Sequence, residues 1–292
     1  MRRMAAVAAS VAALGTCFTG GASAAPAPTI HTNSVALSCP YGDSRTAADQ
    51  QVQPGVVTYD AFGDAQTYTV DSGGNLQSID TSAPFGAALD AVWQNGTDCS
   101  GSSISRNAWA VDVNGVVYGE SDFSGPPANN YGDLGGIHLN RPVVGMSPTS
   151  TGQGYWLVAS DGGIFDFGDA SFYGSLGNVR LNKPIVGMAV TPDGRGYWLV
   201  ATDGGIFQFG DAPFYGSLGN IKLNEPIIGM VATPDGGGYW LVASDGGVFD
   251  FGDATFHGST GNRTLSAPIA GLVPNGSGYT LIGEDGQTYP FP

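Results

Sequence analysis

Near-identical copies of one segment fill the second half of this chain. Residues 154–175 read GYWLVASDGGIFDFGDASFYGS, and the same string returns with few changes at residues 196 and 238. Over the full repeat, residues 154–195 and 196–237 differ at only 10 of 42 positions. Copies this alike must occupy equivalent environments, so the chain is predicted to fold as an array of like units.

Weaker copies extend the array toward both ends of the chain. An aromatic or threonine anchor marks each of six units, at Tyr68, Trp109, Trp156, Trp198, Trp240 and Thr280. We place the unit boundaries near residues 56, 90, 142, 184, 226 and 268. A period of about 42 residues is typical of the blade of a β-propeller.

Each unit contains short apolar segments separated by turn sequences. In one unit the segments are 184–190, 197–201, 206–209 and 214–216, and Gly-Asp combinations lie between them. The segments are apolar at nearly every position, so both faces of each sheet must be covered. We therefore predict an all-β fold, a β-propeller of six blades with four short antiparallel strands each. Five or seven blades are the alternatives.

The two ends of the array are irregular. The last unit stops at Pro292, where its fourth strand should begin, so residues 34–38 of the N-terminal segment 25–55 are the expected ring-closing outer strand. The propeller domain is then 56–292. The second unit carries inserts at 95–103 and 124–130, and long loops on a rigid scaffold are candidate functional surfaces.

Residues 1–24 have the pattern of a signal peptide. Arg2 and Arg3 precede an apolar run from Met4 to Phe18, and Ala22-Ser23-Ala24 suits cleavage. The run is too short to span a bilayer, so we expect a secreted, extracellular protein without membrane insertion, and cell-wall association is the alternative. Lipidation at Cys17 is a further alternative.

The chain is strongly acidic, with a net charge of −15, or −17 once Arg2 and Arg3 are cleaved away. Such a surface repels phosphate backbones, so nucleic acid is not an expected partner. Cleavage would also leave two cysteines, Cys39 and Cys99. In an oxidising compartment these two predict one disulfide, with two free thiols as the alternative.

The repeat string, followed by Leu-Asn-x-Pro and an apolar pair before Gly-Met, resembles a propeller-type repeat of secreted actinobacterial proteins. The strong match runs from Arg141 to Gly258. In that family the repeat often accompanies cell-wall hydrolases, amidases or peptidases. The resemblance implies an extracellular and non-enzymatic propeller, since this chain has no room for a catalytic partner domain.

Reactive motifs are missing from the sequence, and its three histidines are widely spaced. We assign no catalytic residue, no metal ligand and no cofactor. Rings of equivalent aspartates could hold calcium or a sugar, but Asp beside Gly is also what tight turns require, and we favour the turn interpretation. The aspartates in question are Asp161, Asp203, Asp245, Asp169, Asp211, Asp253, Asp193 and Asp235.

Aromatic pairs recur as Tyr155-Trp156, Tyr197-Trp198 and Tyr239-Trp240. Neighbouring residues of a strand point to opposite faces, so each pair is predicted to pack between blades. Ligand-binding positions are expected where the copies differ in polar residues. These candidates are Asp166, Gln208 and Asp250 in the third strand and Tyr173, Tyr215 and His257 in the fourth.

Three functions are compatible with this sequence. The first is a secreted non-catalytic binding module that recognises a cell-wall glycan or an extracellular protein. The second is an extracellular hydrolase or lyase that uses an acidic propeller channel with a divalent cation. It requires three or more carboxylates that converge at one channel mouth. The third is a structural surface protein with neither ligand nor turnover.

Overall fold

The computed structural model describes backbone and side chains for residues 109, 111–118, 129–274, 278–285 and 287–292. For the strands at 35–36, 51–54, 56–59, 65–70, 76–80, 88–97, 104–108, 110, 119–121 and 275 it describes the backbone alone. The signal peptide, Cys17, Cys39, Cys99 and most of both inserts lie outside the described residues, so the cleavage site and the disulfide stay predictions.

The described residues form twenty strands and no helix, which confirms the prediction of an all-β fold. The first sheet has the order β1-β2-β6-β7-β8 and the second β3-β4-β5. Their strands are β1 (Val35–Ala36), β2 (Gln51–Pro54), β3 (Val56–Tyr59), β4 (Ala65–Val70), β5 (Leu76–Asp80), β6 (Ala88–Thr97), β7 (Ile104–Asp112) and β8 (Val117–Ser121).

Four further sheets have three antiparallel strands each, in chain order. They are β9 (Val143–Pro148), β10 (Gly154–Ala159) and β11 (Ile164–Gly168); β12 (Ile185–Val190), β13 (Gly196–Ala201) and β14 (Ile206–Gly210); β15 (Ile227–Ala232), β16 (Gly238–Ala243) and β17 (Val248–Gly252); and β18 (Ile269–Asn275), β19 (Gly278–Gly283) and β20 (Thr288–Phe291).

Local sequence explains these hairpins. Every residue of β12 and β13 is buried, as expected for a strand that carries apolar residues on both faces. The Asp203-Gly204-Gly205 turn joins β13 to β14, and Gly204 has a φ of 75°, which glycine adopts without a Cβ penalty. Val186 is an extra residue opposite β13, because the register shifts between Ile185 and Gly187, and such a bulge increases strand twist.

The prediction of four strands per unit is wrong, because the described repeat sheets end at the third strand. The expected fourth segment, 214–216, is not a strand and forms no ladder with β14. Gly216 has a φ of 145°, which extended strands do not use. The backbone N–H of Tyr215 instead donates to the side chain of Tyr239, so the segment bonds to the next sheet rather than to its own.

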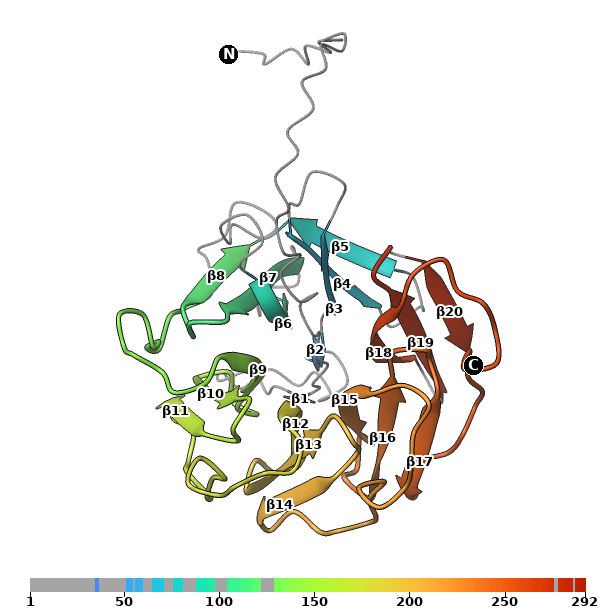
Figure 1. Ribbon diagram of the computed structural model, residues 1–292. Coiled ribbons are helices and arrows are strands. Elements are labelled where there is room, and N and C mark those ends of the chain that lie inside the picture. Colours follow the sequence, from blue (N-terminus) through green and yellow to red (C-terminus); the bar gives the residue numbers. More distant parts are fainter. Residues whose placement is uncertain are drawn as a thin grey trace, which may run out of the picture.

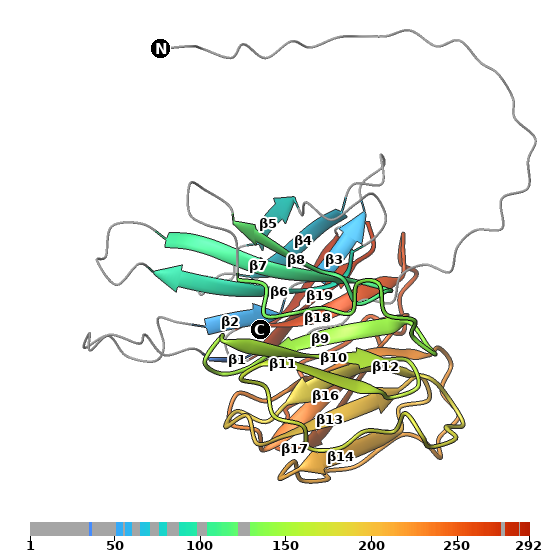
Figure 2. The ribbon, with the colours of Figure 1, turned by 90° about the vertical axis from the view of Figure 1, so that its left-hand side faces the viewer.

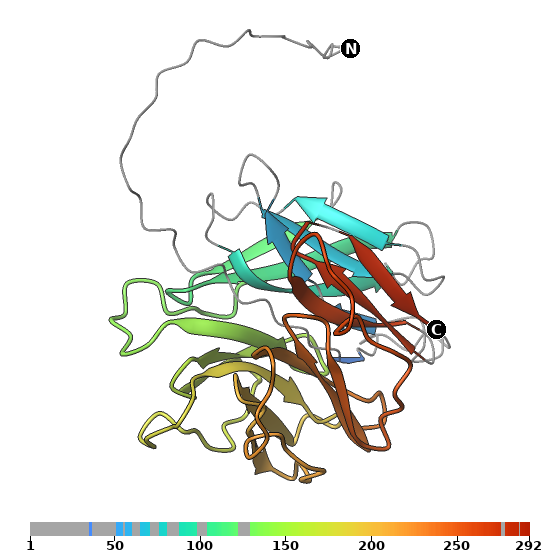
Figure 3. The same cartoon turned by 45° about the vertical axis from the view of Figure 1, so that its right-hand side comes forward.

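The sheets follow one another around a common centre, and in the last four sheets the first strand (β9, β12, β15 or β18) is innermost (Figure 1). One strand of each sheet contacts the corresponding strand of the next, in the order β3, β6, β9, β12, β15 and β18, and β18 also contacts β3. Figure 3 shows the last sheet, in red, beside the blue and cyan strands near the N-terminal end.

The N-terminal strands lie beside the sheet of the second unit. β1 pairs with β2, which pairs with β6, so β1 is not a strand of the last sheet. Figure 2 shows β6 and β7 projecting beyond the neighbouring strands, with β1 and β2 alongside. In the described residues, the free edge of β20 therefore has no strand from the segment 34–38.

The core lies between sheets rather than inside one. Trp156 of one sheet and Tyr197 of the next belong to a single buried cluster, with ring centroids 6.1 Å apart. The members of all three Tyr-Trp pairs are buried, which confirms that they pack between neighbouring sheets.

Candidate binding surface

A repeated group of contacts, which we call the latch, joins each connecting segment to the following sheet. In one latch the hydroxyl of Tyr197 donates to the carbonyl of Gly174 at 2.6 Å and accepts the backbone N–H of Tyr173 at 3.1 Å. The hydroxyl of Tyr173 in turn donates to the carbonyl of Gly194 at 2.9 Å. The other latches centre on the pairs Tyr131–Tyr155, Tyr215–Tyr239 and His257–Tyr279.

Burial changes the acidity of the latch tyrosines. Desolvation raises the pKa of Tyr155 to about 12, because its phenol sits between two sheets. It also raises the pKa of Tyr197, Tyr239 and Tyr279. These phenols therefore remain neutral donors at physiological pH.

The latches place three of the six candidate residues between sheets. Tyr173 and Tyr215 are half-buried, and their hydroxyls bond to turn carbonyls of the next sheet. His257 takes the same position, with Nδ1 2.9 Å from the carbonyl oxygen of Pro292. All three side chains are engaged within the protein, so the contacts they make are structural.

The other three candidates are exposed on the outer strands. Asp166, Gln208 and Asp250 lie at the centre of β11, β14 and β17, each between two half-buried phenylalanines. Each stands directly opposite a buried tryptophan; Gln208, for example, pairs with Trp198. Each polar residue is therefore the cross-strand neighbour of a buried tryptophan, and the packing of that tryptophan holds this part of the outer strand in place.

The same tryptophans position a row of exposed phenylalanines. The indole N–H of Trp198 donates to the carbonyl of Pro213 at 2.6 Å, and the next residue, Phe214, is 54% exposed. Trp156 and Trp240 bond in the same way to the carbonyls before Phe172 and Phe256, which are 55% and 52% exposed. We call the six residues Asp166, Gln208, Asp250, Phe172, Phe214 and Phe256 the outer surface.

The aspartates of the turn strings hold the backbone. Oδ1 of Asp203 accepts the N–H of Gly205 at 3.0 Å, and Asp161 and Asp245 form the same bond. This confirms the turn interpretation for these three residues.

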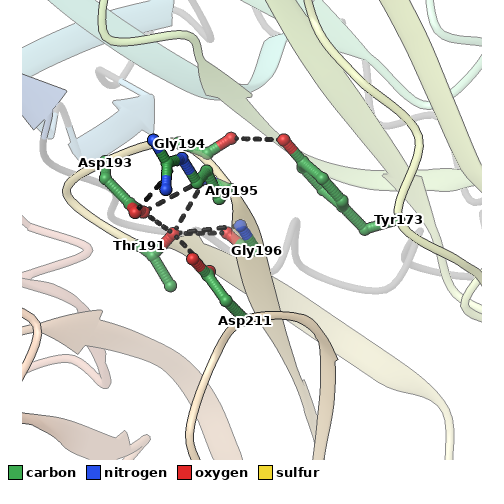
Figure 4. Close-up of polar contacts among 7 residues, drawn as sticks. All are labelled: Tyr173, Thr191, Asp193, Gly194, Arg195, Gly196 and Asp211. Carbon is green, nitrogen blue, oxygen red and sulfur yellow. Dashed lines mark hydrogen bonds and ion pairs between the residues drawn. The ribbon is translucent and has the colours of Figure 1, made fainter.

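A second set of aspartates surrounds a threonine at the opposite end of the strands (Figure 4). Oγ1 of Thr191 lies 2.8 Å from Oδ1 of Asp193 and 3.5 Å from Oδ1 of Asp211, and it accepts the N–H of Gly196 at 3.0 Å. The hydrogen bond from Thr191 holds the pKa of Asp193 below its usual range. Thr233 sits similarly between Asp235 and Asp253, and Thr149 bonds to Asp169.

Two cavities lie at the ends of the sheets. One, of about 380 Å³, is lined by Thr233, Pro234, Asp235, Trp240, Asp253 and Thr255. The other, of about 530 Å³, lies between the loops before β9 and β12 and includes Arg141, Arg180 and Lys183. Among the described residues, no group of three His, Cys, Asp or Glu side chains could share a metal ion.

Several of these features escaped the sequence interpretation. The exposed phenylalanines occur in every strong copy, so a search for differences between copies passes over them. Tyr131 was detectable, because Tyr131-Gly132-Asp133-Leu134-Gly135 matches the string at Tyr173. The cavity at Arg141 joins residues of two loops that are far apart in sequence, and no local motif marks it.

No protein-family model matches the chain, and no curated protein matches it. The described part of the chain holds no helix with the length and hydropathy of a membrane span.

Proposed function

We propose that the six sheets close into a six-bladed β-propeller that acts as a secreted, non-catalytic binding module. The contacts of β18 with β3 and of β3 with β6 support closure, since they link the last unit to the first two. A crystal structure of the full chain tests this, and separated first and last sheets would contradict it. Similarity of the repeat to those of secreted actinobacterial proteins supports the extracellular setting.

The outer surface is the observation that carries the binding function. It places an exposed polar side chain on the outer strand, and an exposed phenylalanine on the segment that follows it, in each of three consecutive units. Single exposed apolar residues are common on protein surfaces, but an aromatic residue exposed at the same position in three consecutive units offers a repeated apolar contact, which we interpret as an interaction surface. In each unit one tryptophan pairs with the polar residue and bonds to the carbonyl before the phenylalanine, and an aromatic face together with a hydrogen-bonding group suits a sugar ring.

Repetition of the surface favours a repeating ligand. Three equivalent positions can bind three equivalent groups of one polymer, and linkage then raises the overall affinity far above that of a single position. We therefore propose a cell-wall glycan as the ligand.

Array and co-sedimentation measurements on the purified chain test this proposal. The expected result is binding to a polysaccharide and a loss of about 100-fold when Phe172, Phe214 and Phe256 are all changed to alanine. The matched control is Ile221→Ala, at an apolar residue that is 57% exposed and lies outside the outer surface. Binding that survives the triple change, or no glycan bound at all, would overturn the proposal.

A further inference from the structure

The larger cavity has an unusual charge for this protein. Arg141 reaches it from the loop before β9, while Arg180 and Lys183 reach it from the loop before β12. All three side chains are exposed, and the polar residues Ser160 and Asn182 also line the cavity. Three cations therefore face one space of about 530 Å³.

No carboxylate among the described residues forms an ion pair with these cations. The chain has 25 acidic residues and only 10 basic ones, so carboxylates are in excess. Yet within the described residues none of the three cations forms a salt bridge or a hydrogen bond. Asp161 is the one carboxylate in the lining, and its Oδ1 accepts the N–H of Gly163 at 3.0 Å, which holds it in its turn.

The combination of three cations occurs only at this pair of the strongly repeated units. Lys183 corresponds to Glu225 in the next unit and to Ala267 in the one after. Arg180 corresponds to Lys222 and then to Thr264. The repeat scaffold alone therefore does not require three cations here, because the next loop carries Lys222 with Glu225 and the one after carries Thr264 with Ala267.

We propose that this cavity is a binding site for an oxyanion, a carboxylate or phosphate group on a small ligand. Guanidinium groups bind both oxyanions through charge-assisted hydrogen bonds, and a lysine adds a point charge. The acidic remainder of the protein repels polyanions, so the ligand carries few charges. The site differs from the outer surface in its residues and in the chemistry it would recognise.

Calorimetric titration of the full chain at low salt tests the site with three probes: inorganic phosphate, glucuronate and glucose. We expect phosphate or glucuronate to bind, and added salt to weaken the binding. Glucuronate binding without phosphate binding would identify a carboxylate ligand, and the reverse would identify a phosphate. Glucose lacks the charge and is expected not to bind here.

Matched variants locate the binding. Arg180→Gln and Lys183→Gln should each weaken it by about tenfold. Lys222→Gln is the control, because it removes a cation at the repeat position equivalent to Arg180, and it should leave the affinity unchanged. Thermal melting of each variant checks the fold. The proposal is wrong if neither anion binds at millimolar concentration, or if Lys222→Gln weakens binding as much as Arg180→Gln.

Discussion

Gly174 and Phe209 lie so close together that a Cβ atom on Gly174 would be 2.5 Å from Cδ1 of Phe209. Gly174 precedes one sheet and Phe209 belongs to that sheet, so the missing side chain lets the connecting segment approach the aromatic ring. The pairs Gly132–Phe167, Gly216–Phe251 and Gly258–Phe291 repeat this relationship.

Gly174→Ala should therefore destabilise the protein strongly. The residue has a φ of 137°, and the new methyl group would overlap the ring of Phe209. Backbone strain and overpacking together predict a loss of about 3 kcal/mol in the free energy of unfolding. Gly136→Ala is the control, since Gly136 also has a positive φ but open space around it, and about 1 kcal/mol is expected there. Urea unfolding measures both, and equal losses would contradict the close approach.

Tyr197→Phe isolates the hydrogen bonds of a latch. The ring packing is kept, but the carbonyl of Gly174 and the N–H of Tyr173 lose their partner. Unpaired groups of this kind cost about 1–3 kcal/mol, measurable by urea unfolding. Tyr289→Phe is the control: this tyrosine is half-buried, and its hydroxyl forms no hydrogen bond within the described residues. If Tyr197→Phe leaves the free energy of unfolding unchanged, the hydrogen bonds of the latch contribute no stability.

Stability should fall in alkaline solution because of the latch tyrosines. The pKa of Tyr155 is about 12 in the folded protein against 10.0 for an ordinary tyrosine, so the unfolded chain loses this proton first. The contribution is therefore complete below pH 10 and is lost as the pH rises from 10 to about 12. Circular dichroism and tyrosinate absorbance should change together over this range. In Tyr155→Phe the dependence on pH should be shallower, and an unchanged dependence would exclude Tyr155 as a contributor.

Thr191→Val should change the acidity of a neighbouring carboxyl. The hydroxyl of Thr191 is the main reason that the pKa of Asp193 is lowered. Valine has nearly the same shape but cannot donate, so the pKa of Asp193 should rise toward its ordinary value, as measured by NMR titration. Thr202→Val is the control, because that hydroxyl forms no hydrogen bond within the described residues. The same shift in both variants would mean that the effect is not local.

The outer surface should show the behaviour of linked sites. Phe214→Ala removes one of three equivalent aromatic groups, so affinity for a polysaccharide should fall by about tenfold, while affinity for a disaccharide falls at most about threefold. Calorimetry with both ligands measures the difference. Equal losses for the two ligands would indicate one independent site rather than a shared surface.

Sequence periodicity was sufficient to predict the strands of the repeat sheets, but not the structure of the segments that connect the sheets. Apolar runs that alternate with turn sequences correctly predicted β12, β13 and β14, because a short apolar run bounded by Asp-Gly turns favours a β-strand. The segment at Phe214 and Tyr215 has the same strand-like composition, yet Tyr215 bonds to the hydroxyl of Tyr239 and the carbonyl of Gly236 in the next unit. Local sequence does not reveal which sheet supplies a hydrogen-bond partner.

The six candidate ligand-binding residues fall into an exposed group and a group bonded within the protein, for a similar reason. Variation between copies correctly marked Asp166, Gln208 and Asp250 as exposed positions. It gave the same weight to Tyr215 and His257, although both side chains bond to the following sheet. Tolerance of two residue types at one place can reflect two ways of making the same contact, and only coordinates separate these cases.

The spacing of the latches bears on how the chain is made. Tyr197 bonds to a backbone N–H only 24 residues earlier, and Tyr239 does the same one unit later. Each sheet is thus fastened to its predecessor soon after it leaves the ribosome, with little entropy lost in closing the loop. We expect the units from β9 to β20 to assemble from the N-terminal side, and the join between β18 and β3 to be the last and slowest event.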